Sequence, residues 1–205
     1  MQRSKHECVR LKPVRALQAI RSVVADADGR RVQFLDTGFW RFRCSLGRAG
    51  ITYNKREGDG CTPVGRFEIL EWRIRRDARV LKRPLGKCLV IRPLDGWCDD
   101  LGAGVYNRPI QLPSRLNHEE MWRLDNKYDV VAILNYNIKP RQRGHGSAIF
   151  FHICSTNFET TAGCVAILSA SMNRLIPLLA PRASIDVFSA RRKLPNRPAP
   201  RWRRA

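Results

Sequence analysis

Short segments in which apolar and polar residues alternate dominate the chain. In residues 40–46, an apolar side chain occupies every second position from Trp40 to Leu46. A period of two places these side chains on one face of an extended segment, so the pattern predicts a half-buried β-strand. Apolar runs rich in β-branched and aromatic residues predict five further strands, at residues 66–74, 88–93, 130–137, 148–155 and 184–188.

Two segments have apolar residues near helical spacing. Residues 114–128 combine a short apolar stripe with a charged opposite face, which predicts a helix. A second helix is expected within residues 168–180, with Ser169 as its cap and Pro177 as an interruption. The apolar stripe of this second helix would consist of Met172, Leu175, Ile176 and Leu179. Clusters of Gly, Pro and Asp separate the predicted elements, so we expect a mainly β fold with one or two peripheral helices.

The charge balance adds a constraint on partners. The net charge is +20, from 38 Lys and Arg against 18 Asp and Glu. Residues 189–205 hold seven basic residues, three prolines and no acid, which predicts a flexible basic tail. The rest of the chain is basic as well, so we expect a polyanionic partner or an anionic cell-wall or membrane surface. Nucleic acid is the least supported, because no helix-turn-helix, zinc-finger or RNP signature is visible. A non-enzymatic polyanion-binding protein stays open as an alternative.

The seven cysteines form no C-x-x-C pair. This odd number and spacing argue against a disulfide framework and against a ribbon-type zinc site. No apolar stretch approaches the about 18 residues of a membrane span, so no transmembrane segment is expected. Charges interrupt the first residues before an apolar core of signal-peptide length can form, so no secretory signal is expected in the chain as written.

The most informative stretch is residues 149–167, where an apolar run ends near His152 and a polar loop leads to Gly163 and Cys164. A thiol attacks an acyl carbon as thiolate, so it needs a base to take its proton. If the loop folds back, His152 could serve as that base for Cys164. Gly163 permits a tight turn and a close approach of the backbone to the substrate. The residues alone leave a structural reading open, in which His152 and Cys164 only fill the core.

A metal site is the third reading of this stretch. His152, Cys154 and Cys164 carry ligand atoms, but the paired spacings typical of tetrahedral zinc sites are missing. We therefore expect no metal. No phosphate loop or nucleotide fingerprint is present either, and no cofactor is expected.

Several motifs in a fixed order resemble one known family. The stretch T-A-G-C-V at residues 161–165, with His152 before it, resembles the active-site block of the L,D-transpeptidase (YkuD-type) family. Residues 58–69 are similar to its T-P-x-G-x-F segment, which Thr62, Pro63, Gly65 and Phe67 match. Five further blocks resemble a subset of the same family, at residues 55–60, 95–100, 106–108, 128–137 and 146–152. The resemblance covers residues 20–188, between a basic N-terminal segment at 1–19 and the basic tail.

The resemblance implies a β-sandwich or barrel-like catalytic domain that acts on peptidoglycan stem peptides. It makes Cys164 the nucleophile, His152 the base and Gly163 part of the turn that presents them. A terminal D-alanine would be released, and the acyl group would pass to an amine in a 3–3 cross-link or to water. The same fold could instead be an L,D-carboxypeptidase or thiol amidase. Such a substrate implies the periplasm or cell envelope as the location.

The sequence departs from the family pattern at two positions close to Cys164. Ala162 stands where the family usually has His, and Ala166 stands where Asn or Arg is usual. Other polar residues must then contact the substrate. The candidates are Thr161, Ser155, Tyr106, Asn107, Arg108 and Asn137.

Overall fold

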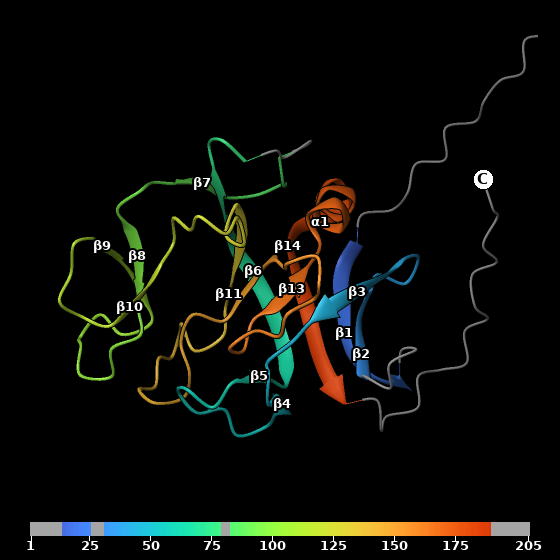
Figure 1. Ribbon diagram of the computed structural model, residues 1–205, viewed down its shortest axis with the longest axis horizontal. Coiled ribbons are helices and arrows are strands. Elements are labelled where there is room, and N and C mark those ends of the chain that lie inside the picture. The colour runs from blue at the N-terminus through green and yellow to red at the C-terminus, as the bar shows by residue number, and fades with distance from the viewer. Residues whose placement is uncertain (1–13, 26–30, 79–82, 190–205) are drawn as a thin grey trace, which may run out of the picture.

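The computed structural model describes residues 14–25, 31–78 and 83–189, and the fold is mainly β (Figure 1). The strands are β1 (Val14–Ala25), β2 (Arg31–Asp36), β3 (Arg41–Ser45), β4 (Gly50–Thr52), β5 (Cys61–Pro63), β6 (Gly65–Arg75), β7 (Cys88–Ile91), β8 (Asp95–Cys98), β9 (Arg108–Gln111), β10 (His118–Glu120), β11 (Val130–Leu134), β12 (Phe150–Ile153), β13 (Val165–Ile167) and β14 (Leu179–Ser189). One α-helix, α1 (Ser169–Leu175), continues into a single 3-10 turn, η1 (Ile176–Leu178). Within this described part, no helix has the length and apolar character needed to cross a membrane.

Nine strands form one mixed sheet in the order β11-β12-β13-β3-β2-β1-β14-β6-β7. The long strand β6 also pairs with β11, so the two ends of the order approach each other and the sheet curls into a half-barrel. Strands β8, β9 and β10 form a separate small sheet, and β4 pairs with β5. Figure 1 shows the small three-stranded sheet to one side of the curled sheet.

All six strands that the apolar patterns predict are present as β3, β6, β7, β11, β12 and β14. In β3, exposed Arg41 and Arg43 alternate with buried Phe42 and Cys44, as a period of two requires. The segments 1–13 and 190–205, which hold most of the predicted basic N-terminal segment and nearly all of the predicted tail, lie outside the described residues.

The predicted helix at residues 114–128 is wrong. The segment contains the short strand β10 and turns, because its backbone hydrogen bonds run across to β8 rather than along a helix. The Met121 amide donates to the Asp95 carbonyl at 2.9 Å, and Met121 is fully buried beneath this small sheet. The apolar residues of segment 114–128 are too few to make a continuous stripe along a helix.

The second predicted helix is confirmed as α1, with Met172, Leu175, Ile176 and Leu179 all buried. The predicted cap is wrong by one residue. Leu168 takes the N-cap position without a side-chain hydrogen bond, and Ser169 is the first helical residue. Pro177 lies in the 3-10 turn, where its missing N–H interrupts no α-helical hydrogen bond.

Strands β12 and β13 divide the core into two parts. Alternate residues of the pair, Phe151, Ile153, Val165 and Ile167, belong to the large apolar cluster that α1 covers. Phe150 and Cys164 belong to a smaller cluster that Trp97, Met121 and Tyr128 complete. The second cluster borders the candidate site.

Candidate active site

Parallel pairing of β12 with β13 brings His152 and Cys164 to the same face of the sheet. His152 lies opposite Ala166 in the register, and Phe151 lies opposite Val165. Cys164 comes two residues before Ala166, so its side chain and that of His152 point to one side, as successive side chains alternate. Both residues line one cavity of about 340 Å³. The loop between His152 and Cys164 therefore folds back, as the sequence analysis required for the two side chains to meet.

The thiol of Cys164 is held by the backbone. Its S–H donates to the Ala148 carbonyl at 3.2 Å, and the Phe150 amide donates to Sγ at 3.3 Å. Burial raises the pKa of this thiol to about 12, although the Phe150 hydrogen bond and the charges of Lys55 and Arg123 act in the opposite direction. The resting thiol is neutral.

The imidazole of His152 is set in one tautomer. Nδ1 lies 2.8 Å from the Ile153 carbonyl, which can only accept, so Nδ1 carries the proton and Nε2 is left as a base. The ring of Tyr128 packs edge-on against the imidazole, with 5.1 Å between ring centroids. Burial lowers the pKa of His152 to about 4, and nearby Arg123 and Lys127 add to this effect. The imidazole is therefore unprotonated at neutral pH.

Two threonines hold the backbone around Cys164, one from the same turn and one from a segment far away in the sequence. Thr161 Oγ1 donates to the Cys164 carbonyl at 2.7 Å and accepts the Gly163 amide at 3.1 Å. Thr62, in the T-P-x-G-x-F segment, approaches the same carbonyl at 3.5 Å. Gly163 has φ of +151°, and a Cβ there would come within 2.8 Å of the Cys61 carbonyl. Only glycine fits this position without strain.

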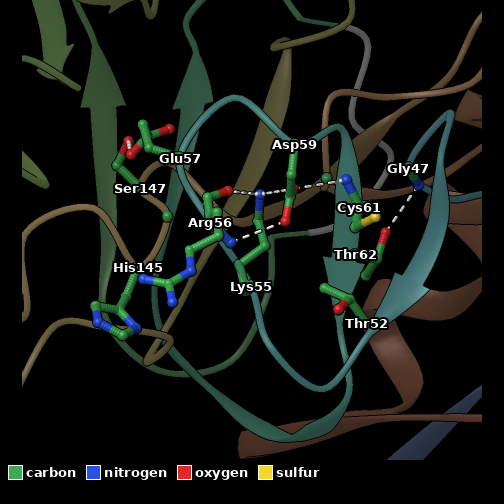
Figure 2. A network of polar contacts seen from close by, with 12 residues as sticks. Gly47, Thr52, Lys55, Arg56, Glu57, Asp59, Cys61, Thr62, His145 and Ser147 are labelled. Atoms are coloured by element: carbon green, nitrogen blue, oxygen red, sulfur yellow. Dashed lines mark hydrogen bonds and ion pairs between the residues drawn. The ribbon is translucent and has the colours of Figure 1, made fainter.

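The loop at residues 55–60 forms another part of the cavity wall (Figure 2). Asp59 organises the loop by accepting the Arg56 and Cys61 amides, both at 2.8 Å. Lys55 forms an ion pair with Asp59 at 2.5 Å. On the other side of the loop, Glu57 accepts hydrogen bonds from Tyr106 at 2.5 Å and from Ser147 at 2.8 Å. Part of the motif thus faces the same space as Cys164.

The cavity wall carries charges of both signs that the sequence analysis did not assign to the site. The cations are Arg48, Lys55, Arg123 and Lys127, and the carboxylates are Glu57, Asp99, Glu119 and Glu159. Burial raises the pKa of Glu119, and the charge of Asp99 raises it further. Burial and Glu57 raise the pKa of Asp99. The block at residues 55–60 was a usable signal for Lys55 and Glu57, whereas Glu119 and Arg123 were hidden in the segment predicted as a helix.

The residues proposed for substrate contact separate into two groups. Thr161 and Ser155 line the cavity. The remaining four, Tyr106, Asn107, Arg108 and Asn137, do not line it. The Tyr106 hydroxyl donates a hydrogen bond to Glu57. Buried Asn107 accepts hydrogen bonds from the Trp97 indole and the Ala148 amide and donates one to the Asn137 carbonyl.

The other two residues of that group hold neighbouring loops. Arg108 donates to the Ile138 carbonyl at 3.1 Å. The Asn137 amide nitrogen donates to the Gln142 and Gly146 carbonyls. The side chains of Arg108 and Asn137 therefore stabilise loops near the cavity through hydrogen bonds.

The three residues considered as metal ligands, His152, Cys154 and Cys164, all line the cavity. Across residues 14–25, 31–78 and 83–189, no group of three or more His, Cys, Asp or Glu is arranged to hold a metal ion. His145 lies in the neighbouring loop, where its carbonyl accepts a hydrogen bond from Tyr136.

Comparison with known proteins agrees with the order of motifs. A search of the curated proteins finds no match. The sequence model of the YkuD family, the L,D-transpeptidase catalytic domain, matches residues 20–187. This range includes nearly every strand of the curled sheet and the whole cavity wall. The chain therefore belongs to the L,D-transpeptidase catalytic domain family.

Proposed function

We propose that this protein is a cysteine-dependent L,D-transpeptidase that acts on peptidoglycan stem peptides in the bacterial cell envelope. The observation that carries the proposal is the placement of Cys164 and His152 on one sheet face, in one cavity, with Nε2 of His152 unprotonated. A thiol and a neutral imidazole are the two groups that acyl transfer through a thioester requires.

In the first half-reaction, Nε2 of His152 takes the proton of the Cys164 thiol as Sγ attacks the carbonyl that precedes a terminal D-alanine. The tetrahedral intermediate then collapses. The amine of D-alanine leaves with the proton from His152, and a thioester remains on Cys164. The resting pair is neutral on both sides, so charge separates only during attack. Cations in the wall, among them Lys55 and Arg123, offset the negative charge that develops.

In the second half-reaction, an amine attacks the thioester carbonyl and gives its proton to Nε2 of His152. The bond between Sγ and the acyl carbon breaks, and the proton returns to Cys164 as the amide product leaves. The carboxylates Glu57, Asp99 and Glu119 share the cavity wall with Cys164, and an ammonium group entering there would relieve their mutual repulsion. Tyr106 and Ser147 hold Glu57 in place for this contact. We therefore favour the side-chain amine of a neighbouring stem as the acceptor, with a 3–3 cross-link as product, over water.

The test is mass spectrometry of the purified protein with tetrapeptide muropeptides. We expect an adduct on Cys164, release of D-alanine, and cross-linked dimers when a second stem is present. Cys164→Ser should abolish both the thioester adduct and D-alanine release. Cys154→Ser is the matched control, because Cys154 lines the same cavity and should retain activity.

Three outcomes would change the assignment. Turnover of tetrapeptides by Cys164→Ser at the wild-type rate would refute the proposed nucleophile. D-alanine release without dimers would make the protein an L,D-carboxypeptidase. Absence of any turnover, together with salt-sensitive binding to a polyanion, would favour the non-enzymatic alternative.

A further inference from the structure

Lys55 is a buried cation beside the nucleophile. Its side chain is 4% exposed, although lysine usually keeps its ammonium group in water. The aliphatic part runs close to Gly146 and Gly163. A Cβ at Gly146 would lie 2.9 Å from Lys55 Cγ, and a Cβ at Gly163 would lie 3.6 Å from Cε. The lysine therefore runs between two backbone segments that hold the Cys164 thiol.

Each of these segments acts directly on Cys164. Gly163 immediately precedes it, and Gly146 comes two residues before Ala148, whose carbonyl accepts the thiol proton. Gly146 has φ of +91°, where only glycine is relaxed, and its missing side chain leaves the space that the Lys55 stem occupies. The two glycines allow a lysine to pass where larger residues would exclude it.

The ammonium group itself is tied down by the loop (Figure 2). Nζ donates to Asp59 Oδ1 at 2.5 Å and to the Arg56 carbonyl at 2.8 Å. Hydrogen bonds from Lys55 and from the Arg56 and Cys61 amides lower the pKa of Asp59 despite its partial burial, so the carboxylate stays ionised. Two hydrogen bonds therefore hold the ammonium group, and two backbone amides hold its counter-ion Asp59 in turn.

Other titratable groups also face Cys164 across the cavity. Arg123 favours the thiolate, Glu119 disfavours it, and Tyr128 and His152 complete this wall as neutral groups. Arg123 is shared, because its guanidinium pairs with Asp125 at 2.6 Å and packs over the Tyr128 ring. The Lys55 stem instead lies against the backbone at Gly163, directly before Cys164.

We propose that Lys55 is a positioning residue whose fixed positive charge stabilises the Cys164 thiolate, with Asp59 as the anchor that holds it there. This inference rests on the proposed role of Cys164 as nucleophile. Lys55 acts through Cys164 and its backbone and takes no proton itself.

The test measures the rate at which iodoacetamide alkylates Cys164 as a function of pH, by peptide mapping. Lys55→Met keeps the length of the stem and removes the charge. We expect its alkylation to be about tenfold slower near neutral pH, because one unit of thiol pKa changes the thiolate population tenfold. Lys87→Met, which removes an exposed lysine paired with Glu71, is the matched control and should leave the curve unchanged.

A second variant separates charge from packing. Asp59→Asn keeps an oxygen for Nζ but removes the negative charge, so alkylation should become faster, by up to about threefold. A purely structural role would move both variants in the same direction. Equal slowing in both, equal acceleration in both, or an unchanged curve in Lys55→Met would overturn the proposal. If Lys55→Met does not fold, Asp59→Asn alone decides, since slower alkylation there contradicts a charge effect.

Failure of this inference and failure of the proposed function give different results. Alkylation needs no peptidoglycan, so the effect of Lys55 on the thiol is visible even if no muropeptide is turned over. Conversely, a wild-type protein that forms the thioester while Lys55→Met alkylates normally would keep the function and lose the role of Lys55.

Discussion

The two faces of the β12–β13 pair are built from neighbouring residues of the same strands, yet they lie in different environments. On one face, Phe151 and Val165 pack into the large apolar cluster under α1. On the other face, His152 and Cys164 meet a cavity with charged walls. Both faces are buried, with His152 5% and Cys164 7% exposed. Burial alone therefore does not distinguish a core residue from one that lines the cavity.

The difference lies in what burial does to each face. On the apolar face, removing side chains from water is favourable for every atom. On the cavity face, the same removal disfavours charge, which raises the pKa of Cys164 and lowers that of His152. The strand pair thus combines a stabilising apolar face with a cavity face on which the thiol and the imidazole are both neutral.

The largest effect is expected from Cys164→Ser on the cavity face. A hydroxyl can keep both contacts of the thiol, to the Ala148 carbonyl and from the Phe150 amide, so the free energy of unfolding should change by less than about 1 kcal/mol. Turnover of tetrapeptide stems should fall by at least about 10³-fold, because a serine hydroxyl is a far weaker nucleophile with this base. D-alanine release and denaturant unfolding measure the two quantities.

Phe151→Ala is the matched change on the apolar face. Phe151 is fully buried and packs edge-on against Trp72. Its truncation should lower the free energy of unfolding by about 3–5 kcal/mol, through lost transfer energy and a cavity. Activity per folded molecule should persist. A variant of Phe151 that stays stable but loses turnover would show that the two faces are not separable.

The next effect concerns pH and the buried imidazole. The pKa of His152 is lowered from 6.5 to about 4, so the unfolded chain takes up this proton before the native protein does. Stability should therefore fall as pH drops from about 6.5 to about 4, by about 3 kcal/mol at about 1.4 kcal/mol per unit. His152→Asn, whose amide can still donate to the Ile153 carbonyl, lacks this contribution.

The measurement is the free energy of unfolding of both proteins between pH 7 and pH 4. Glu119 has the opposite tendency, because its raised pKa favours the native state as pH falls. It is common to both proteins, so the difference between the two curves isolates His152. Parallel curves for the wild type and His152→Asn would mean that folding does not shift the pKa of His152.

The sequence predicted the cavity face of the β12–β13 pair better than it predicted the opposite wall of the cavity. Strand β12 follows from a local apolar run, and the motif around Gly163 and Cys164 is contiguous in the chain. The wall residues Glu119 and Arg123 lie in a segment whose conformation depends on pairing with β8. Such pairing joins residues far apart in sequence, which a periodicity of nearby residues does not report.

The same limit applies to Lys55. Its block of charged residues and glycines resembles an exposed loop, and nothing local indicates that the lysine is buried. The burial results from contacts with Gly146 and Gly163, each about 100 residues away in the chain. Arg108 and Asn137 were predicted as substrate contacts from their place in the motifs, whereas in the structure their side chains donate to loop carbonyls.

The smallest effect is expected from Thr161→Val, which tests how the two faces are joined. Thr161 Oγ1 links the Gly163 amide to the Cys164 carbonyl, and Cys164 leads directly into β13. Loss of the hydroxyl should cost about 1–2 kcal/mol of unfolding free energy, since two partners lose a buried hydrogen bond. The turn would also hold Sγ less firmly, so turnover should fall while the apolar cluster remains intact. Thr160→Val is the matched control, because Thr160 lines the same cavity but is exposed. If both valine variants behaved alike in stability and turnover, the Thr161 hydrogen bonds would contribute nothing to the placement of Cys164, and the turn would depend on Gly163 and Thr62 alone.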